Sequence, residues 1–184
     1  MTLRDEAAAL LAAWTGPTPR EEELRHEFLR HLAEHENGMW RACVPAHLTA
    51  TTAVLSHDGA KVLLTHHPKA KMWLPMGGHC EPGDQTLPDA ALREAFEESG
   101  IDGLTLLPGP LALDRHEVWC HPPQCWHLDV EFGAVAPPGA EFVISDESLA
   151  LDWFPVDDIP EPTDMATRRL ARRARTMLAH NLHN

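Results

Sequence analysis

Long apolar runs are missing from this chain of 184 residues, and so is the pattern of a secretion signal. No stretch approaches the ~18 consecutive apolar residues that a membrane-spanning helix needs. The N-terminal segment 1–14 contains an apolar stretch, but Asp5 and Glu6 precede it, and neither a basic segment nor a small-residue cleavage site accompanies it. We therefore expect a soluble, cytoplasmic protein without a membrane partner.

Cysteine and basic residues are also scarce. Four cysteines, Cys43, Cys80, Cys120 and Cys125, are too few and too scattered for a disulfide framework. The chain has 15 Lys and Arg against 28 Asp and Glu, which gives a formal net charge of −13. Binding of a nucleic-acid polymer depends on basic side chains that neutralise phosphates, so this class of partner is disfavoured. A small phosphorylated substrate remains compatible, because metal ions can bridge two anions.

Two helices are predicted in the first forty residues. Segment 3–14 carries apolar residues at helical spacing. In the second helix, Thr18 has the position of an N-cap, Pro19 that of the first helical residue, and Gly38 that of a terminator. We assign residues 1–40 to a two-helix extension.

From His47 onward the pattern becomes that of strands. Residues 47–56 are rich in Thr, Val and Ala, and the pair Asp58-Gly59 turns the chain into a second run over 61–67, which predicts a β-hairpin. Three more strands and two more helices are expected, the strands over 104–118, 126–136 and 151–154 and the helices over 88–99 and 163–180. This order of elements favours an α+β fold with a mixed sheet over a doubly wound parallel sheet.

Three carboxylates fall on one face of the helix predicted over 88–99. Glu94, Glu97 and Glu98 stand at i, i+3 and i+4, with Cβ atoms roughly 5–6 Å apart, and like charges at this spacing destabilise a helix. Alanine and leucine on the other faces suit packing, so the clustered carboxylates call for a cation. Hard oxygen donors favour Mg²⁺, Mn²⁺ or Ca²⁺ over Zn²⁺. The alternative is a solvated acidic helix face. The upstream pair Gly77-Gly78 weighs against it, because a glycine backbone can approach a ligand closely and offer a carbonyl.

Residues 78–101 resemble the Nudix box, whose pattern is G-x5-E-x7-R-E-U-x-E-E-x-G-U with U an aliphatic residue. Gly78 occupies the opening glycine, and the run from Arg93 to Ile101 matches the second half of the box. There are two departures. Asp84 stands where the family usually has Glu, and one extra residue lies between it and Arg93.

The resemblance covers roughly residues 45–160, which it implies to be a Nudix catalytic domain. The implied fold is an α/β/α sandwich with a mixed β-sheet, preceded by the helical extension 1–40 and followed by a C-terminal helix, 161–184, that packs on the domain. Whether the extension covers the cleft or forms a homodimer interface is left open by the sequence.

The same resemblance implies a function. The implied protein is a divalent-metal-dependent hydrolase that cleaves a phosphoanhydride (pyrophosphate) bond in a nucleoside diphosphate-linked small molecule. Metal ions would neutralise the diphosphate and lower the pKa of a bound water, and a glutamate would accept the proton. Two or more Mg²⁺ or Mn²⁺ ions are implied when substrate is bound.

The resemblance also implies the roles of individual residues. Catalytic roles fall to Arg93, which orients a glutamate, and to Glu94 and Glu97, although which glutamate is the base is left open. The implied metal ligands are Glu94, Glu97, Glu98, the backbone carbonyl of Gly77 or Gly78, and Glu147 from a later loop, with Asp146 and Glu131 as rivals for the last position.

Histidine is abundant, with 13 residues, several of them in or beside the predicted sheet and the glycine loop. We interpret His79 and His127 as cleft residues that contact the substrate. Trp73 can stack on a nucleobase or lie in the core. The pattern from Cys120-His121 to Cys125-x-His127 is unlike the common spacings of structural zinc sites.

Two other functions stay open. A Nudix-fold module can bind a nucleotide or metabolite for regulation without turnover, but all three helix glutamates are present here, which favours an enzyme. An isomerase of the same fold can act on an isoprenoid diphosphate, and it needs a cysteine and a glutamate in the cleft. Cys80 lies close to the box and is the candidate for that cysteine.

Overall fold

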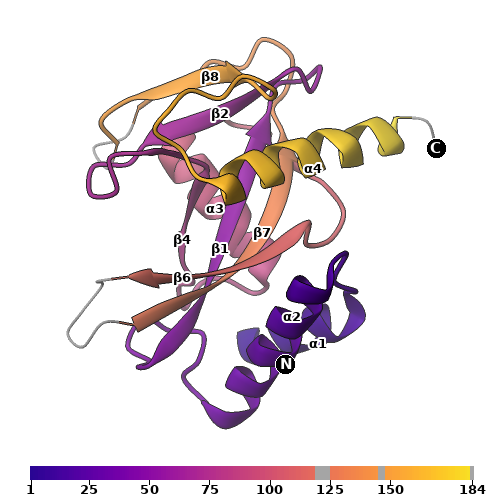
Figure 1. Ribbon diagram of the computed structural model, residues 1–184, viewed down its shortest axis with the longest axis vertical. Helices are drawn as coiled ribbons and strands as arrows, with labels where there is room; N and C mark the ends of the chain where they lie inside the picture. The colour runs from indigo at the N-terminus through magenta and orange to yellow at the C-terminus, as the bar shows by residue number, and fades with distance from the viewer. Residues whose placement is uncertain (119–124, 145–147, 183–184) are drawn as a thin grey trace.

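A mixed, curled β-sheet forms the centre of the computed structural model, which describes residues 1–118, 125–144 and 148–182 (Figure 1). Its axis is β1, Ala46–Leu55, which runs parallel to β7, Cys125–Val135, and antiparallel to β2, Lys61–His66, and β4, Met76–His79. Four further strands complete the sheet: β3 (Trp73–Leu74) and β8 (Leu151–Pro155) pair with β2, and β5 (Thr105–Leu106) and β6 (Ala112–Val118) pair with β7.

Helices cover both faces of this sheet. In Figure 1, α4, Met165–Asn181, crosses in front of the strands, and α3, Leu87–Ser99, lies behind them. Successive residues of a strand point to opposite faces, and β1 serves both helices. The Thr52 hydroxyl donates to the Ala91 carbonyl of α3 at 3.0 Å, whereas Leu55 packs in one core cluster with Leu170 of α4. The α+β fold with a mixed sheet between helical layers is thus confirmed.

The two N-terminal helices, α1 (Leu3–Ala13) and α2 (Pro19–Glu34), share a hydrophobic core with the sheet. Leu11 and Phe28 are fully buried in the same cluster as Leu128 of β7. The Trp14 indole N–H also donates to the Pro110 carbonyl at 2.7 Å, so the extension is fixed at several points. Within the described part of the chain, no helix combines the length and the apolarity needed to cross a membrane.

Most predicted elements are confirmed, and two predictions are wrong. The hairpin exists, with Val54 opposite Leu63. The single strand expected over 104–118 is two strands, because Gly109 takes a positive φ of 64° between two prolines that cannot donate to a ladder. Gly38 does not terminate the second helix, since α2 ends at Glu34 and an extended His35 caps it.

Candidate active site

Helix α3 is held in place by strong local signals at both ends. The Thr86 side chain accepts from the Asp89 N–H at its N-cap, and a left-handed Gly100 with a φ of 66° ends it. Buried alanines, Ala91 and Ala95 among them, pack its inner face against the sheet. The remaining face carries the three glutamates toward the glycine loop.

The glutamates Glu94 and Glu98 contact the backbone of β4 directly. Glu98 is buried, and its Oε1 accepts from the Gly77 N–H at 2.7 Å. The Glu94 carboxylate lies so close to Gly78 that a Cβ there would be 2.7 Å from the carboxyl carbon. Glu97 keeps 53% of its side chain exposed. The predicted cluster is therefore present, with two members fixed against the loop and one open to solvent.

Arg93 and Asp84 form a bidentate ion pair. The Arg93 Nε and Nη2 atoms each donate to one Asp84 oxygen at 3.0 Å. The shorter side chain that stands where the family has Glu therefore still reaches the arginine. Burial opposes ionisation of Asp84, but hydrogen bonds from Arg93 and from the Glu81 N–H outweigh it and lower the pKa of this carboxyl. The hydrogen bond to Asp84 is in turn the main cause that raises the pKa of Arg93.

The rest of the Arg93 guanidinium connects the helix to the loop. Its Nη1 donates to both Glu94 and Glu97 at 3.0 Å, and its Nη2 donates to the His79 carbonyl at 2.9 Å. Two carboxylate oxygens thus converge around one positively charged nitrogen. These contacts place Arg93 beside Glu94 and Glu97, and the orientation of a glutamate by Arg93 stays a prediction.

The donor set fits a hard divalent cation. Carboxylate oxygens from one helix face meet a backbone segment that carries no side chain, and Gly78 leaves open the space that a Cβ would fill beside Glu94. Oxygen donors of this kind bind Mg²⁺ or Mn²⁺. Glu94, Glu97 and Glu98 are the residues that could hold such an ion.

Three acidic residues were candidates for the additional metal ligand from a later loop. Glu147 and its rival Asp146 lie outside the described residues. The other rival, Glu131, is buried on β7 and pairs with Arg169 of α4 at 2.8 Å, on the sheet face opposite to α3. Burial, reinforced by the neighbouring Asp129, raises the pKa of Glu131 to about 8.

Trp73 belongs to an aromatic group. Its ring meets Phe154 edge-on with centroids 4.6 Å apart and His66 with centroids 5.1 Å apart. The Thr163 hydroxyl donates to its carbonyl at 2.7 Å. The side chain is partly buried and packs against the core cluster that includes Leu170, so only part of it remains accessible.

The structure brings the rings of His79 and His127 together on the sheet face opposite to α3. Their ring centroids lie 5.0 Å apart. A third imidazole, His47, was not predicted from the sequence, and its ring centroid lies 5.0 Å from that of His79 and 4.9 Å from that of His127. The signal that could have found it is the parallel pairing of β1 with β7, which sets His47 opposite His127. Burial is the largest cause that lowers the pKa of His127 to about 2, and the neighbouring imidazole of His116 is the next largest.

Cys80 is poorly suited to proton transfer. It is a free cysteine with 6% of its surface exposed. Burial, followed by the charge of Asp84, raises the pKa of its thiol to about 12. A thiol in this state is neither a ready acid nor a thiolate near neutral pH.

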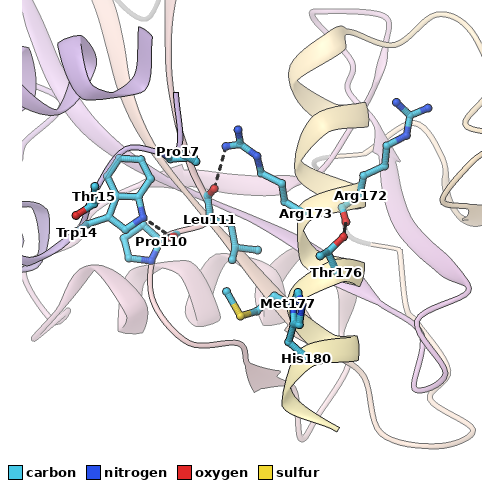
Figure 2. A pocket seen from close by; sticks show the side chains of 10 residues that line it. All are labelled: Trp14, Thr15, Pro17, Pro110, Leu111, Arg172, Arg173, Thr176, Met177 and His180. Carbon is cyan, nitrogen blue, oxygen red and sulfur yellow. Dashed lines mark hydrogen bonds between the residues drawn. The ribbon is translucent and has the colours of Figure 1, made fainter. Parts of the chain in front are cut away.

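A hollow of about 440 Å³ lies between the α1–α2 junction, residues 110–111 and α4. Figure 2 shows Trp14 on one side of it and Met177 with His180 on the other, while Arg173 points to the Leu111 carbonyl. Its described lining includes neither Asp nor Glu, and none of its residues comes from β4 or α3. It is therefore separate from the carboxylate cluster.

Comparison with known proteins agrees with the geometry. The family profile of the NUDIX domain matches residues 46–174, which is more than half of the chain. A NUDIX-family hydrolase from Clostridium perfringens superposes with a TM-score of 0.54 at 25% identity, covering 73% of this chain and 97% of the other. A MutT NUDIX hydrolase from Burkholderia pseudomallei gives 0.52 at 26% identity, with 70% and 97% covered.

A further structural neighbour carries a ligand. The NUDIX domain of Shewanella oneidensis NrtR, in complex with ADP ribose, superposes with a TM-score of 0.53 at 21% identity, covering 81% of this chain and 97% of that domain. No protein among those with curated descriptions matches the sequence.

Proposed function

The chain belongs to the Nudix family and is a hydrolase of that family, and we propose that it cleaves the phosphoanhydride bond of a nucleoside diphosphate-linked small molecule with Mg²⁺ or Mn²⁺. The observation that carries this proposal is that Glu94 and Glu98 lie against the Gly77-Gly78 backbone, while Arg93 binds Glu94 and Glu97 together. Three carboxylates held together in this way suit a divalent cation better than solvent alone.

Each residue of the cluster has a role in this proposal. Glu98, fixed by the Gly77 N–H, and the more exposed Glu97 are metal ligands. Glu94 is a ligand or the base that removes a proton from water, and its contact with Arg93 fixes its orientation. The bound ions would neutralise the diphosphate oxygens and make water more acidic. The Gly78 carbonyl and Glu147 would complete the ligand set.

Substrate contacts are proposed for His79, His127 and Trp73. His79 follows the glycine pair directly, and the ring of His127 lies against that of His79 on the sheet face opposite to α3. Trp73 has a partly accessible ring that could stack on a nucleobase. The aromatic and imidazole groups would bind the part of the substrate that is not hydrolysed.

The two alternative functions receive less support. The isomerase reading needs a reactive cysteine, and the pKa of Cys80, raised to about 12 by its burial, makes this thiol unsuitable. The binding module without turnover is disfavoured by the full set of glutamates and by the ion pair that orients them.

A substrate panel tests the proposal. Purified protein is incubated with ADP ribose, nucleotide sugars, dinucleoside polyphosphates and nucleoside triphosphates, each with Mg²⁺, with Mn²⁺ and with EDTA, and the products are separated by anion-exchange chromatography. Metal-dependent formation of a monophosphate from at least one compound supports the hydrolase. Tight binding of one compound by calorimetry, without turnover of any, would establish the regulatory module instead.

A further inference from the structure

Three imidazoles from three different strands meet on the sheet face opposite to α3. His47 of β1, His79 of β4 and His127 of β7 each offer one ring nitrogen, and these nitrogens all lie within 4.8 Å of one another. Strand register explains the meeting. His47 is opposite His127, and His79 is opposite Thr49, which shares the face of His47 because alternate residues of a strand point the same way.

The tautomer of His47 is set by its surroundings. Its Nδ1 lies 3.3 Å from the Cys43 carbonyl, which can only accept, so Nδ1 carries the proton and Nε2 carries the lone pair. Histidines that bind metals usually donate their other ring N–H to a backbone carbonyl or a carboxylate in this way. His47 is also fully buried, so its ring has a fixed place.

The cluster contains the donors of a soft or borderline metal ion. A neutral imidazole presents a lone pair on one ring nitrogen and does not repel a cation. Nitrogen donors suit Zn²⁺, whereas Mg²⁺ prefers oxygen. In a tetrahedral zinc site with Zn–N bonds of about 2.1 Å, nitrogens stand about 3.4 Å apart, so these three, all within 4.8 Å of one another, would have to approach by at most about 1.4 Å.

We propose that His47, His79 and His127 form a binding site for a divalent transition metal ion, with Zn²⁺ as the preferred occupant. A site with three histidines leaves one coordination position for water or a ligand oxygen. This site is distinct from the carboxylate cluster in donor type and in position, since the glutamates come from α3 on the other face of the sheet.

Strand β4 joins the two sites. The Gly77 and Gly78 backbone touches Glu98 and Glu94, while the next residue, His79, turns its ring into the histidine cluster and its carbonyl to Arg93. An ion on the histidines therefore anchors the segment that also shapes the carboxylate site. The Zn²⁺ proposal does not rest on the proposed hydrolase activity. Zn²⁺ binding is measured without substrate, so the two proposals can fail separately.

The test is Zn²⁺ binding to the full chain. Protein stripped with chelator and desalted is titrated with ZnCl2 by calorimetry, and metal content after gel filtration is measured by mass spectrometry. We expect about one Zn²⁺ per chain with a dissociation constant of roughly 1 µM or below. His79→Gln and His127→Gln should each weaken binding at least about 100-fold, because each removes one of three ligands.

Two control variants make the result specific. His66→Gln removes a partly buried strand histidine outside the cluster and should leave Zn²⁺ affinity within about threefold of the original protein. Glu97→Gln should also retain Zn²⁺. Circular dichroism and melting in EDTA identify any variant that fails to fold, and the partly buried His79 and His127 are less prone to this than the fully buried His47. The proposal is overturned if the original protein binds no Zn²⁺, if both histidine variants bind it unchanged, or if Glu97→Gln abolishes the binding.

Discussion

The adjacent glycines Gly77 and Gly78 of β4 have different neighbours, so a substitution at one should affect stability and at the other activity. At Gly78 a Cβ would meet the carboxylate of Glu94, the far end of a flexible side chain, at 2.7 Å. At Gly77 it would meet the Ala50 carbonyl at 2.6 Å and the Thr51 backbone at 2.7 Å, neither of which can move without disturbing β1. Gly83 faces open space.

Alanine at these three positions should therefore have three different effects. Gly78→Ala should cost less than about 1 kcal/mol of unfolding free energy but lower kcat about tenfold or more, because Glu94 is displaced. Gly77→Ala should destabilise the fold by about 3 kcal/mol. Gly83→Ala is the matched control and should change neither. Urea unfolding and initial rates measure both quantities, and equal losses of stability for Gly77→Ala and Gly78→Ala would contradict the contacts described.

Asp84 gives a prediction about pH. Its pKa is lowered in the folded protein, since Arg93 outweighs burial, so the pair stabilises the fold above the ordinary carboxyl pKa of about 3.9 and loses this effect as pH falls through the lower folded value. Asp84→Asn should cost about 2 kcal/mol at pH 7, and the difference from the original protein should shrink below about pH 4.

The measurement is urea unfolding of both proteins from pH 7 to pH 3. Asp102→Asn, in an exposed turn, is the control and should stay within about 0.5 kcal/mol at all pH values. A difference for Asp84→Asn that grows as the solution becomes more acidic would show that the pair does not stabilise the folded state.

An ion pair between Glu21 and Arg173 joins α2 to α4, which lie far apart in the sequence. Arg173 of α4 binds both carboxylate oxygens of Glu21, and its Nη2 lies 2.9 Å from Oε2. The Glu21 side chain is 4% exposed and also accepts from the Thr18 hydroxyl at 2.7 Å. Loss of one partner would leave the other charge poorly solvated.

Glu21→Gln should therefore lower the unfolding free energy by about 3 kcal/mol, as expected when one member of a buried pair is removed. Glu23→Gln makes the same change two residues further along α2, where the pair with Arg20 leaves 70% of the glutamate side chain exposed, and it should cost less than about 0.5 kcal/mol. Thermal unfolding compares the two. Similar melting temperatures for both variants would mean that the α2–α4 pair adds nothing to stability.

Elements with strong local signals could be predicted from the sequence. The helix expected over 88–99 is α3, Leu87–Ser99, because Thr86, Pro88 and Gly100 mark its ends. The short strands β3 and β4 could not be predicted, since glycine and proline dominate that segment and its strand form depends on pairing with β2 and β1. The prediction that Gly38 ends the second helix is wrong, because a glycine ends a helix by taking a positive φ and the local sequence does not fix that angle.

For the molecule as a whole, the carboxylate site could be predicted because its three glutamates lie on one helix. The contacts of Arg93 with Asp84 and His79 were less predictable, since they depend on how the loop folds back on α3. The histidine cluster was predicted only in part. Its members are far apart in sequence, and His47 joins them only through the parallel register of β1 and β7. Long-range pairing thus determines the features that the sequence did not reveal.

The central claim is that divalent metal held by the α3 glutamates drives phosphoanhydride hydrolysis. The most direct measurement is the Mg²⁺-dependent initial rate of Glu97→Gln beside Glu81→Gln, an equal change of charge at an exposed position of the same loop. We predict a loss of at least about 100-fold for Glu97→Gln, or about 2.7 kcal/mol of transition-state stabilisation, and less than a threefold change for Glu81→Gln. Equal rates for the two variants, or full turnover in EDTA, would contradict the claim.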